Sequence, residues 1–181
     1  MRKNRKNLSN VNMKGADFSD NETLKSIKSS SLTQGNFNNS KIARIKIEHS
    51  DMSSSEFTRS SICKSRILHT NLSKTNWEWS NLAQVIMHDN NFNKSNFSCA
   101  SLRAAELKEC KLTNVNFKFS NLEKITLEKC NLKDADFCNA NLKNARFIDC
   151  NLKGVTFNLQ TNLPFSMDKA KELGMVFVPM L

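Results

Sequence analysis

The amino-acid sequence predicts an all-β solenoid whose coils each have four short sides. Three observations predict this fold class: a bulky apolar residue recurs at every fifth position from Ile27 to Phe157, an aromatic residue recurs at every twentieth, and a mostly small residue stands two positions before each apolar one. A period of five fits neither the α-helix, with about 3.6 residues per turn, nor the strand, with a period of about two. A chain that turns in the same sense every five residues winds into a solenoid.

Each five-residue unit has an inner and an outer side. In a unit such as Ser95-Asn96-Phe97, the first and third residues lie on one face of an extended fragment, and the middle residue lies on the other. We therefore expect the small and apolar residues to point into the core and the Asn to point outward. The two remaining residues of the unit turn the chain before the next unit begins.

The aromatic residues set the number of sides. Equivalent residues stack when they are separated by one coil, so a separation of twenty residues means four units per coil. The aromatic column consists of Phe37, Phe57, Trp77, Phe97, Phe117, Phe137 and Phe157. Phe18 lies nineteen residues before Phe37, so we expect it to extend the column across a one-residue deletion. The deletion falls within 19–26, where Leu24 is expected to turn inward at a distorted corner.

The pattern divides the chain into three segments. They are an N-terminal coil with a register slip (1–26), an uninterrupted repeat (27–158) and a C-terminal capping or dimerisation segment (159–181). The repeat pattern stops after Phe157. Beyond it, Ser166 is the expected N-cap of a short helix over 167–173 that Gly174 ends, and 175–178 is expected to form a short strand.

The repeat resembles the pentapeptide-repeat proteins, whose motif is a small residue, then Asp or Asn, then Leu or Phe, then two variable residues. The motif is clearest at Ala16-Asp17-Phe18, Ala135-Asp136-Phe137 and Ala140-Asn141-Leu142, and the resemblance covers about residues 6–158. It implies a right-handed quadrilateral β-helix, here of about seven to eight coils. The handedness comes from the resemblance alone.

The C-terminal helix and apolar run resemble the dimerisation segment of the quinolone-resistance branch of this family. The resemblance implies a homodimer through the C-terminus, with a candidate interface formed by Leu173, Met175, Val176, Phe177 and Val178. It also implies a protein partner, since the best-characterised members bind DNA gyrase and topoisomerase IV and protect them from quinolones or peptide toxins. Two features differ: those rods are strongly acidic, whereas this chain has a net charge of +10, and that branch inserts loops between coils.

One side of the predicted rod is strongly basic. Its inward residues run from Ile42 to Leu142 at twenty-residue steps, and its charged residues, opposed only by Glu123, are Lys41, Arg44, Lys64, Arg103, Lys124 and Lys143. We call this side the basic face. It is either a solvated surface or a binding site for nucleic acid or another anionic surface. Trp79 and Phe119 are expected to project at corners of the neighbouring side, two coils apart.

Few residues suggest chemistry. No nucleotide-binding loop, zinc motif or transmembrane run occurs in the sequence, so we expect a non-enzymatic protein without a cofactor. Ser166 and Lys169 have the serine-x-x-lysine spacing of penicillin-binding enzymes, but no companion motif follows, and a helix cap is the simpler interpretation. His49, His69 and Asp89 share a corner column, where they form either a metal site or a solvated surface.

The six cysteines lack the spacing of a disulfide framework, which favours a reducing compartment and a cytosolic protein. Cys110, Cys130 and Cys150 lie at small inward positions, so we expect a buried column of thiols. The other three, Cys63, Cys99 and Cys138, lie at outward positions.

The function we expect is that of a rod-like protein-binding scaffold, with DNA gyrase or topoisomerase IV as the partner that the family resemblance implies. The alternatives are a basic-face binder of nucleic acid or an anionic surface, and a bacterial effector delivered into a host.

Overall fold

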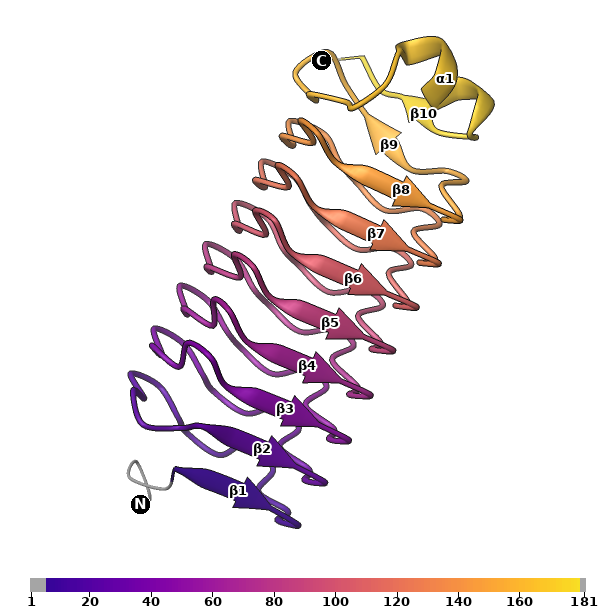
Figure 1. The fold of residues 1–181 in the computed structure, drawn as a ribbon. Coiled ribbons are helices and arrows are strands. Elements are labelled where there is room, and N and C mark those ends of the chain that lie inside the picture. Colours follow the sequence, from indigo (N-terminus) through magenta and orange to yellow (C-terminus); the bar gives the residue numbers. More distant parts are fainter. Residues whose placement is uncertain (1–5, 180–181) are drawn as a thin grey trace.

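Short parallel strands stack one above another along a rod in the computed structural model, which describes residues 6–179 (Figure 1). One side of the rod is an eight-stranded sheet in sequence order. Its strands are β1 (Asn7–Ser9), β2 (Ser26–Lys28), β3 (Lys46–Glu48), β4 (Arg66–Leu68), β5 (Ile86–His88), β6 (Glu106–Lys108), β7 (Thr126–Glu128) and β8 (Arg146–Ile148). The predicted all-β solenoid is confirmed; its right-handed sense and its number of coils stay predictions.

The register of the strands gives the length of a coil. From β2 to β8 neighbouring strands pair at a step of twenty residues, as Ile47 does with Ile67. On the other three sides, isolated parallel bridges keep the same step, for example Asn76 with Asn96 and Asn81 with Ser101. The chain therefore makes four sides per coil.

The core is built from the apolar residue at the centre of each unit. The aromatic column is buried throughout, and ring centroids from Phe18 to Phe137 follow one another at 3.9–5.8 Å in stacked geometry. Phe157 ends the column by meeting Phe177 edge-on at 5.7 Å. Stacked and edge-to-face rings each add to the energy of burial, so this column ties neighbouring coils together.

Trp77 is the one ring of the column that carries a polar group. Its indole N–H donates to Thr75 Oγ1 at 2.8 Å, and that hydroxyl in turn contacts Ser95 Oγ at 3.0 Å. All three side chains are buried. Because a buried N–H without a partner costs about 1–3 kcal/mol, the threonine two positions before the tryptophan is what allows an indole at this level.

Asparagine is common immediately before the apolar centres because both the oxygen and the nitrogen of its side-chain amide form hydrogen bonds there. Asn96 Oδ1 accepts the amide of Ser98 at 3.1 Å, which closes a turn, while Asn96 Nδ2 donates to Asn76 Oδ1 at 3.1 Å. The next coil repeats the contact, since Asn116 Nδ2 donates to Asn96 Oδ1 at 2.9 Å. The outward column thus forms a ladder of amides alongside the backbone ladder.

The corners turn through left-handed backbone conformations. Among the described residues, φ is positive at three glycines and at 27 residues of other types. Only glycine adopts this conformation without steric cost, and Asn and Asp tolerate it better than most. A chain with four glycines therefore turns mainly through polar side chains that point into solvent.

The N-terminal coil joins the rod one residue short. Leu8 pairs with Ile27 across nineteen residues, and Phe18 stacks on Phe37 at 5.1 Å. At the shortened corner, Asn21 Oδ1 accepts the amide of Leu24 at 2.9 Å, and Leu24 is fully buried. The first five residues of the expected segment 1–26 lie outside the described residues.

The C-terminal segment folds back on the last coil. After β9 (Thr156–Phe157) the chain forms α1 (Met167–Glu172), and β10 (Val176–Phe177) then pairs with β9 in parallel (Figure 1). Ser166 Oγ accepts the amide of Lys169 at 3.2 Å, so this serine caps the helix as predicted, and Gly174 is left-handed. No helix within residues 6–179 is long and apolar enough to cross a membrane.

The repeat does not stop at Phe157, contrary to expectation. Asn162 bridges Asn141 across twenty-one residues, and the buried Thr161 takes the inward place beside Ala140. One residue has been inserted in the turn before them, where the Asn158 amide donates to Thr161 Oγ1 at 3.1 Å. The sequence did not reveal this additional unit, because the insertion shifts Asn162 out of the five-residue period.

Candidate functional site

The structure places the cations of the basic face together on one side of the rod. All six side chains are exposed, while the apolar centres of this side are fully buried. Arg44, Lys64 and Lys124 occupy the left-handed corner of their units, with φ of 62°, 58° and 59°. Coils stack at roughly 4.8 Å per step, so Arg44 and Lys64 lie one step apart, and Lys124 lies three steps beyond Lys64, past Gln84 and Ala104.

Two carboxylates partly neutralise this face. Glu123 lies 3.4 Å from Arg103 Nε and 3.7 Å from Lys124 Nζ, and Glu22 lies 3.2 Å from Lys41 Nζ. Exposed pairs of this kind contribute little and are screened by salt, so the face stays cationic. Sequence reasoning missed Glu22 because the one-residue deletion takes it out of the register; the nineteen-residue step from Phe18 to Phe37 also links Glu22 to Lys41.

Two large aromatic side chains border the basic face. Trp79 and Phe119 are 59% and 60% exposed, at the corner where the side of the aromatic column turns into the basic face. Cys99 lies between them in the same corner column, one coil from each. We call Trp79, Cys99 and Phe119 the aromatic ridge.

A histidine corner lies at the end of the strands of the eight-stranded sheet. The rings of His49 and His69 stack with centroids 4.8 Å apart and planes 9° apart, and His69 Nδ1 lies 2.9 Å from Asp89 Oδ2. The neighbouring His88 pairs separately with Glu106 at 3.0 Å. Face-to-face rings hold their ring nitrogens in parallel planes, so the two imidazoles cannot aim at one ion between them. Within residues 6–179 no three His, Cys, Asp or Glu side chains are grouped as metal ligands.

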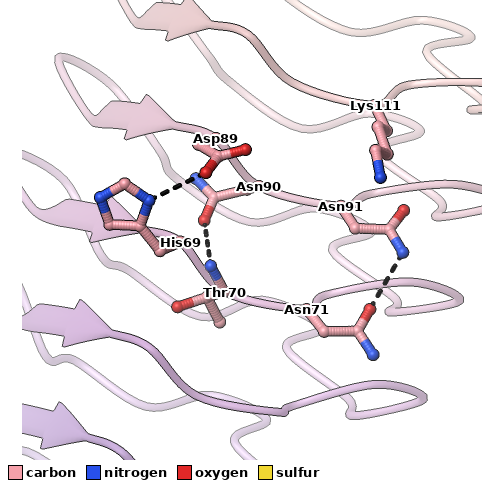
Figure 2. Close-up of a pocket in the computed structure, with 7 residues that line it drawn as sticks. All are labelled: His69, Thr70, Asn71, Asp89, Asn90, Asn91 and Lys111. Atoms are coloured by element: carbon pink, nitrogen blue, oxygen red, sulfur yellow. Dashed lines mark hydrogen bonds and ion pairs between the residues drawn. The ribbon is translucent and has the colours of Figure 1, made fainter.

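Beside this corner lies a shallow polar hollow of about 220 Å³ (Figure 2). Its lining comes from three successive coils and includes His69, Asn71, Asn90, Asn91 and Lys111. The amides are already used: Asn90 Oδ1 accepts the Thr70 amide at 2.9 Å, and Asn91 Nδ2 donates to Asn71 Oδ1 at 3.2 Å. Sites for small molecules are usually about 300–1,000 Å³ and largely apolar, so this hollow has the character of an amide ladder open to water.

The cysteine column forms as predicted in its first two members. Cys110 and Cys130 are buried and Cys150 is half-buried, and each thiol donates to a main-chain carbonyl at 3.3–3.5 Å. The neighbouring Cys110 thiol and burial raise the pKa of Cys130 to about 12. Because the thiolate is the reactive form, Cys130 is an inert packing group, and Cys110 is shielded by its burial.

Cys138 was expected to face outward, and that expectation is wrong. It is 8% exposed. The inserted turn after β9 lies against this corner, where Asn158 Oδ1 accepts the amide of Asn139 at 3.0 Å. Cys63 and Cys99 lie at outward positions and are half-exposed.

The candidate dimer interface divides into inward and outward residues. Met175 is buried and Phe177 packs on the core, so in this structure these two residues cap the last coil. Leu173, Val176 and Val178 are 36–49% exposed. Of the five candidate residues, only the latter three have substantial exposed surface.

An apolar hollow of about 460 Å³ lies beside these residues. It is lined by Phe147 of β8, by Phe165 and by Leu173 at the end of α1. Sequence reasoning missed it, because Phe165 lies outside the repeat and packs on Phe147 at 6.0 Å only through the fold-back of the chain. This end of the rod therefore carries an apolar hollow beside exposed apolar side chains.

Comparison with known proteins agrees with the repeat. The family model described as the pentapeptide repeat region matches residues 68–137 and 102–163, which together span more than half of the chain. No curated protein matches the sequence.

Two solved structures represent the similar folds. Full-length QnrB1, a plasmid-mediated fluoroquinolone resistance protein, has a TM-score of 0.52 at 15% identity, over 95% of this chain and 93% of that chain. HetL, a pentapeptide repeat protein involved in heterocyst differentiation regulation in Nostoc sp. strain PCC 7120, has a TM-score of 0.47 at 19% identity, over 82% and 86% of the two chains. With the five-residue period, the four-sided parallel solenoid and the family match in agreement, the chain belongs to the pentapeptide-repeat proteins.

Proposed function

We propose that this protein is a non-enzymatic scaffold that binds a protein partner along the sides of its rod. The observation that carries the proposal is the display of side chains in straight columns, each held by a continuous backbone ladder such as the one from Asn76 through Asn96 to Asn116. Such a surface is preorganised, so little conformational entropy is lost when a long partner binds. The polar hollow contains the His69–Asp89 pair, but the hydroxyl of its Thr70 already donates to the Leu68 carbonyl at 2.8 Å, and the hollow at the C-terminal end is mainly apolar.

DNA gyrase or topoisomerase IV is the partner that we propose to test first. The likeness to QnrB1 extends over nearly the whole of both chains and favours this choice. The net charge of +10 opposes it, because like charges repel at a DNA-binding surface. The test is a gyrase supercoiling assay with a fluoroquinolone present. Relief of inhibition at stoichiometric protein supports this target; unchanged inhibition removes the topoisomerase and leaves the scaffold proposal standing.

We further propose a homodimer through the C-terminal end. The exposed Leu173, Val176 and Val178, together with the apolar hollow beside Phe147 and Phe165, supply the apolar surface that a two-fold contact needs. Light scattering after gel filtration should give twice the chain mass of 20.6 kDa. Val176→Lys should halve it, whereas Leu159→Lys, at a still more exposed apolar position outside the candidate interface, should leave it unchanged. A wild-type monomer would refute the dimer.

The basic face supports a second candidate function, the binding of a polyanion. Six exposed cations against two carboxylates give this side a charge that the fold does not require. Arg103→Glu with Lys124→Glu should release the protein from heparin at a lower salt concentration. The matched control is Lys46→Glu with Arg66→Glu, the same charge change on exposed residues of β3 and β4. Equal loss in both variants would show a response to net charge and refute a dedicated face.

A further inference from the structure

The aromatic ridge has no structural explanation. Corner positions in this rod are left-handed, and a non-glycine residue there costs about 1–2 kcal/mol. The same corner column is polar elsewhere, with Asn39, Arg59 and Asn139. Trp79 and Phe119 are mostly exposed and recover little burial energy in return. The fold would accept asparagine at both positions.

Apolar residues are rare at the corners and are concentrated here. Of the 27 non-glycine residues with positive φ in the described chain, the apolar ones are Trp79, Cys99, Ala104 and Phe119. Three of the four are consecutive members of one column, the aromatic ridge. An isolated exposed aromatic residue needs no explanation, but a row of apolar corners beside a charged face marks an interaction surface.

The ridge and the basic corner flank a flat strip. The basic face begins at the corner of Trp79 and ends at the corner that holds Arg44, Lys64 and Lys124. Between the two corners, the outward position carries a small polar residue on four successive coils: Ser61, Ser101 and Asn121 are half-buried and Asn81 is exposed. On the coil before them this position holds Lys41. A ligand lying on this strip has aromatic rings along one edge and cations along the other.

That combination is the one by which proteins bind unpaired nucleic acid strands. A cationic surface follows the phosphates, and exposed aromatic rings stack on bases, which contributes about 1–3 kcal/mol per base. Trp79 and Phe119 are two coils apart, roughly 10 Å, so each ring is free to stack on its own base. A duplex keeps its base faces inside the helix and cannot use the rings.

We propose that the strip between the aromatic ridge and the basic corner binds single-stranded nucleic acid, with bases stacked on Trp79 and Phe119 and phosphates at Arg44, Lys64, Arg103 and Lys124. The proposal rests on the second candidate function, polyanion binding at the basic face, and adds the class of polyanion and the role of the rings. It does not depend on the protein partner.

The two tryptophans of the chain allow a direct measurement. Trp77 is fully buried and Trp79 is exposed, so a ligand that changes tryptophan fluorescence by stacking acts through Trp79. Titration with a fifteen-nucleotide oligothymidine or oligouridine should quench this fluorescence, and the affinity should fall steeply as salt rises. A duplex of the same length should bind more weakly and leave the fluorescence unchanged.

Variants separate stacking from charge. Trp79→Ala should weaken oligothymidine binding at least about fivefold, the equivalent of about 1 kcal/mol. Trp79→Phe should retain most of the affinity. The matched control is Met167→Ala, since Met167 is an exposed apolar residue of α1, outside the repeat. Both positions are on the surface, so thermal unfolding of each variant should stay cooperative.

Three outcomes would overturn the inference, and they differ in what else they remove. Heparin or duplex binding with no effect of Trp79→Ala leaves the polyanion function intact and removes the stacking site. Binding to phosphatidylglycerol vesicles but to neither oligonucleotide assigns the face to a membrane surface. Absence of binding to heparin, oligonucleotides and vesicles removes the second candidate function together with the inference.

Discussion

At the scale of the residue, the aromatic column carries much of the cohesion between coils. Phe97 is fully buried and stacks between Trp77 at 5.8 Å and Phe117 at 5.3 Å. Phe97→Ala should lower the free energy of unfolding by about 3–5 kcal/mol, because the cavity cannot close within a ladder fixed above and below. Lys94→Ala, three residues earlier on the surface, should change it by less than about 0.5 kcal/mol. Urea unfolding measures both, and a smaller loss at Phe97 would contradict its inward place.

The exposed aromatic residue at position 79 should respond in the opposite direction. Trp79 has φ of 60°, a conformation that asparagine adopts more readily, as Asn39 and Asn139 do in the same column. Trp79→Asn should therefore raise the free energy of unfolding by a few tenths to about 1 kcal/mol. Thermal unfolding checks this. A loss of stability would mean that packing of the ring against the rod contributes more to stability than the left-handed backbone conformation costs.

At the scale of the element, each column has its own chemistry, and the cysteines make this measurable. Cys130 has a pKa raised to about 12, and burial raises the pKa of Cys138 to about 11. Alkylation at pH 8 followed by mass spectrometry should modify Cys63 and Cys99 first, because these are the two half-exposed outward thiols. In denaturant all six should react. Early modification of Cys130 in the folded protein would contradict the buried column.

One carboxylate in the outward amide column should make stability depend on pH. Partial burial would raise the pKa of Asp136, but the Cys138 amide at 2.9 Å and Lys118 Nζ at 3.0 Å outweigh it and hold this pKa below its ordinary value. A lowered pKa in the folded state means that the stabilisation is complete above the ordinary Asp value of about 3.9 and is lost as pH falls through the folded value.

The comparison of urea unfolding at pH 7 and pH 3 tests this. Asp136→Asn should lose less stability between the two pH values than the wild type does. Lys118→Gln should fall between them, because the Cys138 amide still favours the carboxylate. An identical pH response in Asp136→Asn and wild type would assign the acid sensitivity to other groups.

At the scale of the whole molecule, the five-residue period predicted the architecture of the coils. It did not predict the structural effects of the one-residue insertion that interrupts the repeat. The place of Phe97 in the core follows from the twenty-residue spacing of the aromatic column, because a coil of twenty residues stacks Phe97 on Trp77 and Phe117. Cys138 and Asn162 could not be placed, because both depend on a one-residue insertion whose position no period reveals. The pairing of Glu22 with Lys41 was hidden by a deletion in the same way.

The binding surfaces were predictable to a lesser degree. The six cations of the basic face were assigned to one side by counting alone. Trp79 and Phe119 were assigned to corners of the neighbouring side in the same way, but the exposed fraction of each ring could not be predicted from the period. Phe165 was missed because a fold-back outside the repeat brings it to Phe147.

The uniform step between coils also has a mechanical consequence. Ladder partners lie nineteen to twenty-one residues apart from Leu8 to Asn162, so each coil is held only by the coil before it and the coil after it. A rod pulled by its two ends should therefore yield in equal steps, each releasing one coil, or on the order of 65 Å of extended chain. The force at which unfolding begins should therefore be set by the least stable contact between two neighbouring coils, and not by the total area that the rod buries.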